Sequence, residues 1–348
     1  MFCEPSKWFA GYVVALLFAV IANSADARGT VLTRQVDSPA LGVTKRYRVY
    51  LPDGYETSTR RYPVIYLLHG WGVTENAWVA PSLDLPATAD ELKLQAIVVM
   101  PDGDRSFYAN SVTPADYDRC LKDANPNRNQ EEPREGFCVR TPRYEDYIIS
   151  DLVPHVDKNF RTIAKREARA LSGESGGGLG AMHLAMRHKD LFSVAASHSA
   201  PLALLYEGPH PYEKTNVKLR VSFDSYPPGL SEAVEIFGTD VSHWRAYDPS
   251  SLIDDLRDGE LAIYFDCGEE DEAGFHDHAM FFHDRLVARG IKHTYISTPG
   301  KHNESLWKDR LRFSLKFEIE QFTNAGVYSS HLRTSLASAA LMKPSAST

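Results

Sequence analysis

Short apolar runs recur along the middle of the chain, and longer segments with helically spaced apolar residues separate them. Runs of this length and composition are typical of buried strands. Residues 144–159 and 275–289 show the helical spacing, and a third helix is expected after residue 175. Strands that alternate with helices predict an α/β fold with a mainly parallel sheet covered by helices on both faces. The six predicted strands are residues 47–51, 64–68, 96–100, 168–171, 261–265 and 293–297.

Three segments depart from this alternation. Residues 111–143 are polar and contain several prolines, and residues 201–250 are rich in Pro, Gly and Tyr. Each is expected to be an insertion or a lid, because loops of this length are often functional. The Ser- and Ala-rich residues 326–348 predict a disordered tail. The folded domain is therefore expected to span residues 28–325.

The first residues have the layout of a secretory signal peptide. Lys7 precedes a largely apolar run, residues 8–22, and small residues occupy the −3 and −1 positions of a cleavage site after Ala27. A membrane anchor is the alternative, but the run is shorter than the roughly 20 residues that span a bilayer. Residues 1–27 are therefore predicted to direct export, to a periplasm or to the outside of the cell.

Charge and cysteine content narrow the function classes. The formal net charge of −8 argues against nucleic acid, whose binding depends on Lys and Arg. Cys120 and Cys138 share one polar segment, and in an oxidising compartment they predict a disulfide, with two free thiols as the alternative. Cys267 follows an apolar run and is expected to be a buried thiol. No Cys/His zinc spacing occurs, and no carboxylate pattern supports a metal at His276, His278 and His283. We expect no metal or cofactor.

A nucleophile is predicted at Ser175. The strand at 168–171 leads into a G-x-S-x-G sequence at 173–177, and a helix follows, which is the context of a nucleophile elbow. Glycines allow strand and helix to approach closely, and the N–H of Gly176 is expected to face the substrate oxygen. An inert turn and a phosphate-binding loop are the alternatives, but the Lys-Ser/Thr of a P-loop is missing.

A serine hydroxyl needs a general base, and the fold predicts an acid and then a histidine downstream. His302 follows the last predicted strand and is the expected base. The preceding strand runs into residues 266–271, which contain four carboxylates. A position in the loop favours Asp271 as the acid, with Asp266 and Glu270 as alternatives.

A second oxyanion donor is expected in the loop after an early strand, beside the N–H of Gly176. The strand at 64–68 runs into His-Gly-Trp-Gly at 69–72. The N–H of Trp71 is the predicted donor, and that of Gly72 is the alternative.

Six motifs resemble, in the same order, those of the esterase family that includes esterase D (S-formylglutathione hydrolase), feruloyl esterase modules, enterochelin esterases and secreted mycolyltransferases. The resemblance covers about residues 45–322. It implies an α/β-hydrolase core and acyl-enzyme chemistry, and the family's functional residues match Ser175, Asp271, His302 and Trp71. Two departures are Gly176, where the family often has Met, and the long segment 111–143. The motifs lie at 67–70, 99–103, 144–147, 173–177, 266–271 and 299–302.

The predicted function is therefore that of an exported serine carboxylesterase acting on a small-molecule or carbohydrate-linked ester. The same triad would serve an acyltransferase or a thioesterase of the S-formylglutathione hydrolase type, and an inactive binding protein of the same fold is the remaining alternative. The acyl and alcohol parts of the substrate, and the oligomeric state, do not follow from the sequence.

Overall fold

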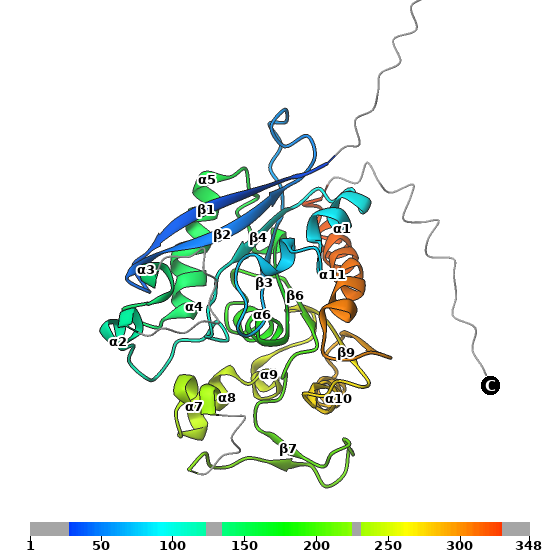
Figure 1. Cartoon of the computed structure of the whole chain (residues 1–348). Helices are drawn as coiled ribbons and strands as arrows, with labels where there is room; N and C mark the ends of the chain where they lie inside the picture. The colour runs from blue at the N-terminus through cyan, green and yellow to red at the C-terminus, as the bar shows by residue number, and fades with distance from the viewer. Residues whose placement is uncertain (1–27, 123–133, 225–230, 329–348) are drawn as a thin grey trace, which may run out of the picture.

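The computed structural model describes residues 28–122, 134–224 and 231–328 (Figure 1). The predicted signal peptide, and the predicted tail from residue 329 onward, lie outside these residues. Within them, Tyr328 is buried, and its hydroxyl accepts a hydrogen bond from the N–H of Gln95 at 2.9 Å. The packed part of the chain therefore extends three residues beyond the predicted boundary at 325.

An eight-stranded sheet forms the centre of the fold, in the order β1-β2-β4-β3-β5-β6-β9-β10. Strand β2 pairs antiparallel with both β1 and β4, and the other neighbours in the sheet are parallel. This confirms the predicted fold class. The strands are β1 (Thr30–Ser38), β2 (Val43–Leu51), β3 (Val64–Leu68), β4 (Ile97–Pro101), β5 (Arg169–Glu174), β6 (Val194–His198), β9 (Ala262–Gly268) and β10 (Thr294–Thr298), and β7 (Tyr206–Gly208) pairs with β8 (Lys218–Leu219) separately.

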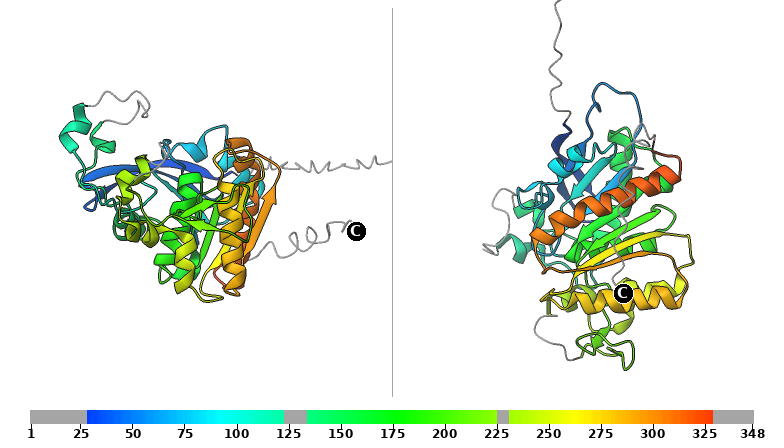
Figure 2. Two further views of the ribbon diagram at one scale, coloured as in Figure 1. Left: turned by 90° about the horizontal axis from the view of Figure 1, so that it is seen from below. Right: turned by 90° about the vertical axis from the view of Figure 1, so that its right-hand side faces the viewer.

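Helices cover both faces of the sheet (Figure 2). Successive side chains of a strand point to opposite faces. In β3, accordingly, Tyr66 packs in the core under α5, α6 and α10, whereas Ile65 packs in the core under α1 and α11. The helices are α1 (Leu85–Glu91), α2 (Tyr117–Lys122), α3 (Arg134–Phe137), α4 (Tyr144–Asp146), α5 (Val153–Asn159), α6 (Ser175–Arg187), α7 (Ser231–Phe237), α8 (Val241–Tyr247), α9 (Pro249–Leu252), α10 (Phe275–Ala288) and α11 (Glu304–Asn324).

All six predicted strands are present, but the sequence pattern missed β1 and β6. Strand β1 lies at the sheet edge with most of its side chains at least partly exposed, so it lacks a continuous apolar run. Strand β6 is buried but has the sequence Val-Ala-Ala-Ser-His, in which small and polar residues replace the β-branched ones that signal a strand. The predicted helix at 144–159 forms as α4 and α5 joined by a π-helical stretch, Tyr147–Leu152.

The two predicted insertions, residues 111–143 and 201–250, each contain secondary structure outside the central sheet. Residues 111–143 contain α2 and α3, and a disulfide joins Cys120 to Cys138, as predicted. Residues 201–250 contain β7, β8 and helices α7 to α9 (Figure 1). Cys267 is a buried free thiol, also as predicted.

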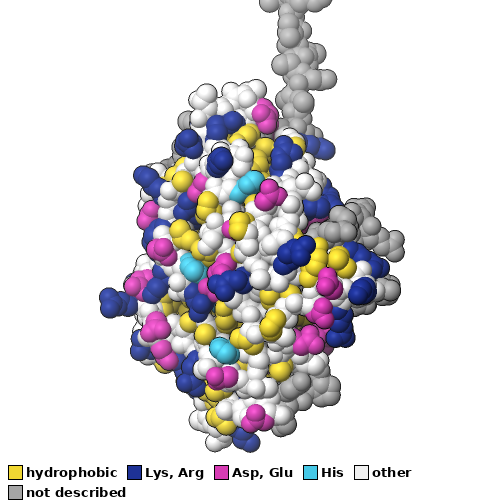
Figure 3. Space-filling model, turned by 90° about the vertical axis from the view of Figure 1, so that its left-hand side faces the viewer, with side chains coloured by type: hydrophobic (Ala, Val, Ile, Leu, Met, Phe, Trp, Pro, Cys, Tyr) yellow, Lys and Arg dark blue, Asp and Glu magenta, His cyan; other side chains and the backbone are white. Residues whose placement is uncertain are grey.

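The described surface carries charges of both signs. On the face drawn in Figure 3, acidic and basic side chains are interspersed, without a broad area of one sign. No helix within the described ranges is long and apolar enough to cross a membrane.

One buried carboxyl group makes the stability of the fold depend on pH. Glu318 of α11 is fully buried, and burial raises its pKa to about 8, from an ordinary value of 4.5. Between these two values the folded chain keeps a proton that the unfolded chain releases, so stability should fall as pH rises.

We therefore expect Glu318→Gln to be more stable than the parent at pH 9 by a few kcal/mol, at about 1.4 kcal/mol per pKa unit, and nearly equal to it at pH 5. Urea unfolding at both pH values measures this. Glu320→Gln, an exposed position on the same helix, is the control. Parallel pH profiles for the parent and Glu318→Gln would contradict the prediction.

Candidate active site

Ser175 stands at a turn between β5, which ends at Glu174, and α6, which begins at Ser175 itself. Its φ of 51° is in the left-handed region, which is uncommon for a non-glycine residue. A Cβ on Gly177 would lie 2.4 Å from the carbonyl oxygen of Leu68, and one on Gly173 would lie 2.6 Å from the backbone of Gly177. The glycines therefore permit the close approach of β3, β5 and α6 that forms the turn.

The structure brings Ser175, His302 and Asp271 together from three segments far apart in the sequence. Nε2 of His302 lies 3.0 Å from Oγ of Ser175, and Nδ1 lies 2.9 Å from Oδ2 of Asp271. A carboxylate only accepts hydrogen bonds, so Nδ1 carries a hydrogen, and in the neutral ring Nε2 can accept the serine proton. Asp271 follows β9 and His302 follows β10, and both loops lie at the carboxyl ends of parallel strands.

Neighbouring groups hold Asp271 and the His302 ring. The N–H of Ala273 donates to Oδ1 of Asp271 at 3.0 Å, and the Cys267 thiol lies 3.5 Å from Oδ2. Burial raises the pKa of that thiol, which keeps it protonated as a donor. The rings of Phe275 and Trp307 make edge contacts with His302, at centroid distances of 5.2 and 5.0 Å.

The alternative acids lie elsewhere. Asp266 is buried and hydrogen-bonds to Nδ1 of His198 at 2.9 Å, and Nε2 of His198 lies 3.0 Å from Oγ of Ser314. This second Ser–His–Asp arrangement is at most 2% exposed at every member, and Arg310 also binds the Asp266 carboxylate. No ester could reach it without opening the core. Glu270 is exposed.

The backbone amides of Trp71 and Gly176, the two predicted oxyanion donors, lie close together beside Ser175. The amide nitrogen of Trp71 lies 3.2 Å from the position that a Cβ on Gly176 would take. A Cβ on Gly72, the alternative donor residue, would lie 3.8 Å from the side chain of Arg105. Gly176 lies in the first turn of α6, where unpaired N–H groups and the helix dipole favour negative charge.

A cavity of about 600 Å³ opens beside Ser175. Residues 201–250 supply much of its wall, whereas none of the described residues of 111–143 is among those lining it. Polar groups at the wall include His210, whose Nδ1 lies 2.6 Å from the Asp277 carboxylate, and Arg220, which pairs with Glu207 at 2.9 Å. The aromatic members of the lining are Trp71, Phe107, Tyr206, Trp244 and Phe275.

Glu174 is a residue near the site that the sequence analysis did not select. Its carboxylate is buried and accepts a hydrogen bond from the N–H of Gly70, in the loop that carries Trp71. Burial raises its pKa to about 7. Its position directly before Ser175 was visible in the sequence, but its contact with a loop about a hundred residues earlier was not.

The histidines considered for a metal have other partners. The ring of His278 makes edge contacts with Tyr206 and Phe275 at centroid distances of 5.7 and 5.6 Å. His276 bonds to Ser297, and His283 bonds to His293. Across the described ranges, no group of three or more His, Cys, Asp or Glu side chains is arranged to hold a metal ion.

Similarity to known proteins agrees with this fold. The model of the Putative esterase family matches residues 38–317, and the chain belongs to that family. Esterase Rv1288 of Mycobacterium tuberculosis is 30% identical over 286 residues, which cover 76% of this chain and 53% of the relative. The chain thus spans about half the length of that relative.

Two further similarities concern feruloyl esterases. An endo-1,4-beta-xylanase/feruloyl esterase of Xylanibacter ruminicola is 27% identical, over 57% of this chain and 25% of the relative. A solved structure of a ferulic acid esterase superposes with a TM-score of 0.62 at 21% identity, covering 84% of this chain and 99% of that one. Because the identity is so low, this superposition supports the fold alone.

The close backbone approach at the turn predicts a steric effect. Gly177→Ala should lower the free energy of unfolding by at least about 3 kcal/mol, the upper end of the overpacking range, because backbone oxygens of β3 have nowhere to move. Gly259→Ala is the control: its φ is +82° but no atom lies within 4 Å, so a cost of about 1–2 kcal/mol is expected. Urea unfolding compares them, and equal losses would contradict the steric account.

Proposed function

We propose that this chain is an exported serine carboxylesterase with Ser175 as nucleophile, His302 as general base and Asp271 as its acid partner. The main support for this proposal is the chain of hydrogen bonds from Ser175 through His302 to Asp271, beside the cavity. The N–H groups of Trp71 and Gly176 are proposed as the oxyanion hole.

The reaction proceeds in two steps. Oγ of Ser175 attacks the ester carbonyl carbon as Nε2 of His302 accepts the hydroxyl proton, and the resulting oxyanion is bound by the two amides. His302 returns that proton to the leaving alcohol as the carbon–oxygen bond breaks, which leaves an acyl-enzyme. Water then attacks the acyl carbon and gives a proton to His302, which passes it to the departing Ser175 oxygen.

The role of Asp271 follows from its contacts. Its Oδ2 accepts from Nδ1 of His302, which fixes the tautomer with a free lone pair at Nε2 and stabilises the imidazolium that forms. The carboxylate is fully buried and is itself oriented by the Ala273 amide. The ring is therefore presented to Ser175 in one orientation.

The cavity supports an ester with an aromatic part as the first substrate to test. Its volume of about 600 Å³ accommodates a small-molecule acid or alcohol, and several aromatic rings line it. The Xylanibacter relative named as a feruloyl esterase supports the same choice. Carbohydrate-linked esters of such an acid belong to this class.

Export has two supports. The first is the signal-peptide layout of residues 1–27. The second is the Cys120–Cys138 disulfide, since structural disulfides persist mainly in oxidising compartments. We propose that the mature enzyme works in a periplasm or outside the cell.

The two Ser–His–Asp arrangements provide a matched test of the nucleophile. We expect Ser175→Ala to lower kcat for p-nitrophenyl acetate by about 10⁴-fold or more, because it removes the attacking oxygen. Ser314→Ala should keep most of the activity, because Ser314 is buried away from the cavity. Full activity in Ser175→Ala, or its loss only in folded Ser314→Ala, would contradict the assignment.

A substrate panel separates esterase from the other functions of the same triad. We expect methyl ferulate and short p-nitrophenyl esters to be hydrolysed faster than S-formylglutathione, with free acid as the main product when a sugar alcohol is added. Chromatography of the products measures this. A dominant sugar ester would identify an acyltransferase, preferred cleavage of the thioester would identify a thioesterase, and no turnover by the folded parent would indicate a binding protein.

A further inference from the structure

The carbonyl oxygen of the peptide between Gly70 and Trp71 is held by a neighbouring side chain. Its carbonyl oxygen, on Gly70, accepts a hydrogen bond from Nδ1 of His69 at 2.8 Å. In a trans peptide the carbonyl and the following N–H point in opposite directions. The Trp71 N–H is therefore directed away from the His69 ring, on the side where its nitrogen approaches Gly176. The ring of His69 thus sets the direction of the proposed oxyanion donor.

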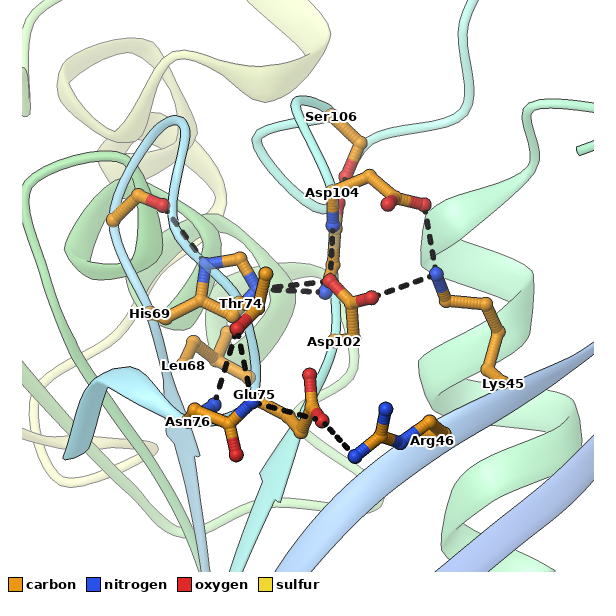
Figure 4. Close-up of polar contacts among 12 residues, drawn as sticks. Lys45, Arg46, Leu68, His69, Thr74, Glu75, Asn76, Asp102, Asp104 and Ser106 are labelled. Carbon is orange, nitrogen blue, oxygen red and sulfur yellow. Dashed lines mark hydrogen bonds and ion pairs between the residues drawn. The ribbon is translucent and has the colours of Figure 1, made fainter. Parts of the chain in front are cut away.

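The orientation of His69 is fixed in turn by the loop after β4. Because a carbonyl oxygen only accepts, Nδ1 of His69 must carry a hydrogen. The N–H of Gly103 donates to Nε2 at 2.9 Å, and Oδ1 of Asp102 lies 3.4 Å from the same nitrogen. Figure 4 shows the ring of His69 beside the Asp102 carboxylate, with Lys45 on the other side of Asp102. The ring is 1% exposed and has no solvent to reorient it.

A buried lysine holds that loop. Nζ of Lys45, from β2, donates to Oδ2 of Asp102 at 2.9 Å and to Oδ2 of Asp104 at 3.0 Å (Figure 4). The lysine side chain is completely buried. Burial opposes ionisation of Asp102, but the ammonium group of Lys45 holds the pKa of Asp102 well below the usual range. The loop therefore closes around a charged pair.

We propose that the buried Lys45–Asp102 ion pair is a positioning device for the oxyanion hole, acting through the ring of His69. A buried pair of this kind adds little net stability compared with apolar residues of similar size. What such a pair does provide is one fixed geometry. Here it fixes the loop after β4, so that the Gly103 amide orients the His69 ring and the ring orients the 70–71 peptide. The inference rests on the proposed function, because it assumes that the Trp71 N–H binds an oxyanion.

The test removes both charges of the Lys45–Asp102 pair together, because removal of one partner alone leaves an uncompensated buried charge. The Asp104 carboxylate loses Lys45 as well but keeps the hydrogen bond from the Tyr144 hydroxyl. Lys45→Met/Asp102→Asn is compared with the parent and with Arg169→Met/Asp157→Asn. The control pair is also a close ion pair with little exposure, at 2.5 Å, but it joins the start of β5 to α5, away from the cavity. Urea unfolding first establishes that each variant is folded.

Kinetics with p-nitrophenyl acetate provide the first result. We expect kcat of Lys45→Met/Asp102→Asn to fall about 10- to 100-fold, within the roughly 10²- to 10³-fold effect of losing an oxyanion donor. KM should change less than about threefold, because the lost interaction acts in the transition state. Affinity for a phenyl trifluoromethyl ketone, whose adduct with Ser175 carries an oxyanion, should fall by the same factor as kcat. The control should keep parental values, and a folded test variant that also keeps them would overturn the inference.

A second measurement requires no turnover and so separates this inference from the proposed function. In ¹⁵N-labelled protein, we expect the amide resonances of Gly70, Trp71 and Gly103 to shift or broaden in Lys45→Met/Asp102→Asn but not in the control variant. Unchanged resonances would overturn the positioning role, even if the parent hydrolyses no ester. An inactive parent whose resonances respond as expected would leave the linkage standing and reject the esterase assignment.

Discussion

The site depends on the contact between the end of β3 and the first turn of α6, where backbone meets backbone with no side chain between. Gly177 makes that contact possible, because any Cβ there would overlap the carbonyl oxygens of Leu68 and His69. One consequence is the left-handed conformation of Ser175, which raises its hydroxyl above the sheet. The other is the closeness of Trp71 to Gly176, since the loop after β3 is drawn to the start of the helix. The proposed nucleophile and the candidate oxyanion donors are thus fixed by a single packing constraint.

The histidine and the acid are positioned by a different part of the sheet. Strands β9 and β10 run parallel, so the loops that follow them leave the same edge side by side. Asp271 and His302 can therefore meet although they lie on separate connections. The ring contacts of His302 with Phe275 and Trp307 come from the two helices that follow those loops. Both helices thus support the ring of His302, although only α11 follows the strand that delivers it.

Sequence reasoning succeeded where a local pattern encodes the structure. The elbow at 173–177, the placement of His302 after the last strand and the disulfide all follow from short-range signals, and the structure contains each arrangement. It missed β6, because small residues buried in a sheet have no strong periodicity. The Gly70–Glu174 bond and the Lys45–Asp102 pair were also missed, because a buried polar contact depends on two distant positions at once. No window along one chain contains both partners.

The cavity wall has a simple origin in the chain. Tyr206, Arg220 and Trp244 all belong to residues 201–250, which join β6 to β9 without contributing a strand to the central sheet. The reacting groups, by contrast, are anchored to the sheet itself. The proposed reacting groups and a large part of the cavity wall are therefore encoded in separate stretches of the gene. Exchange of residues 201–250 alone would change which substrates the cavity admits and leave the reaction centre unchanged. This architecture therefore has a short evolutionary route to new substrates.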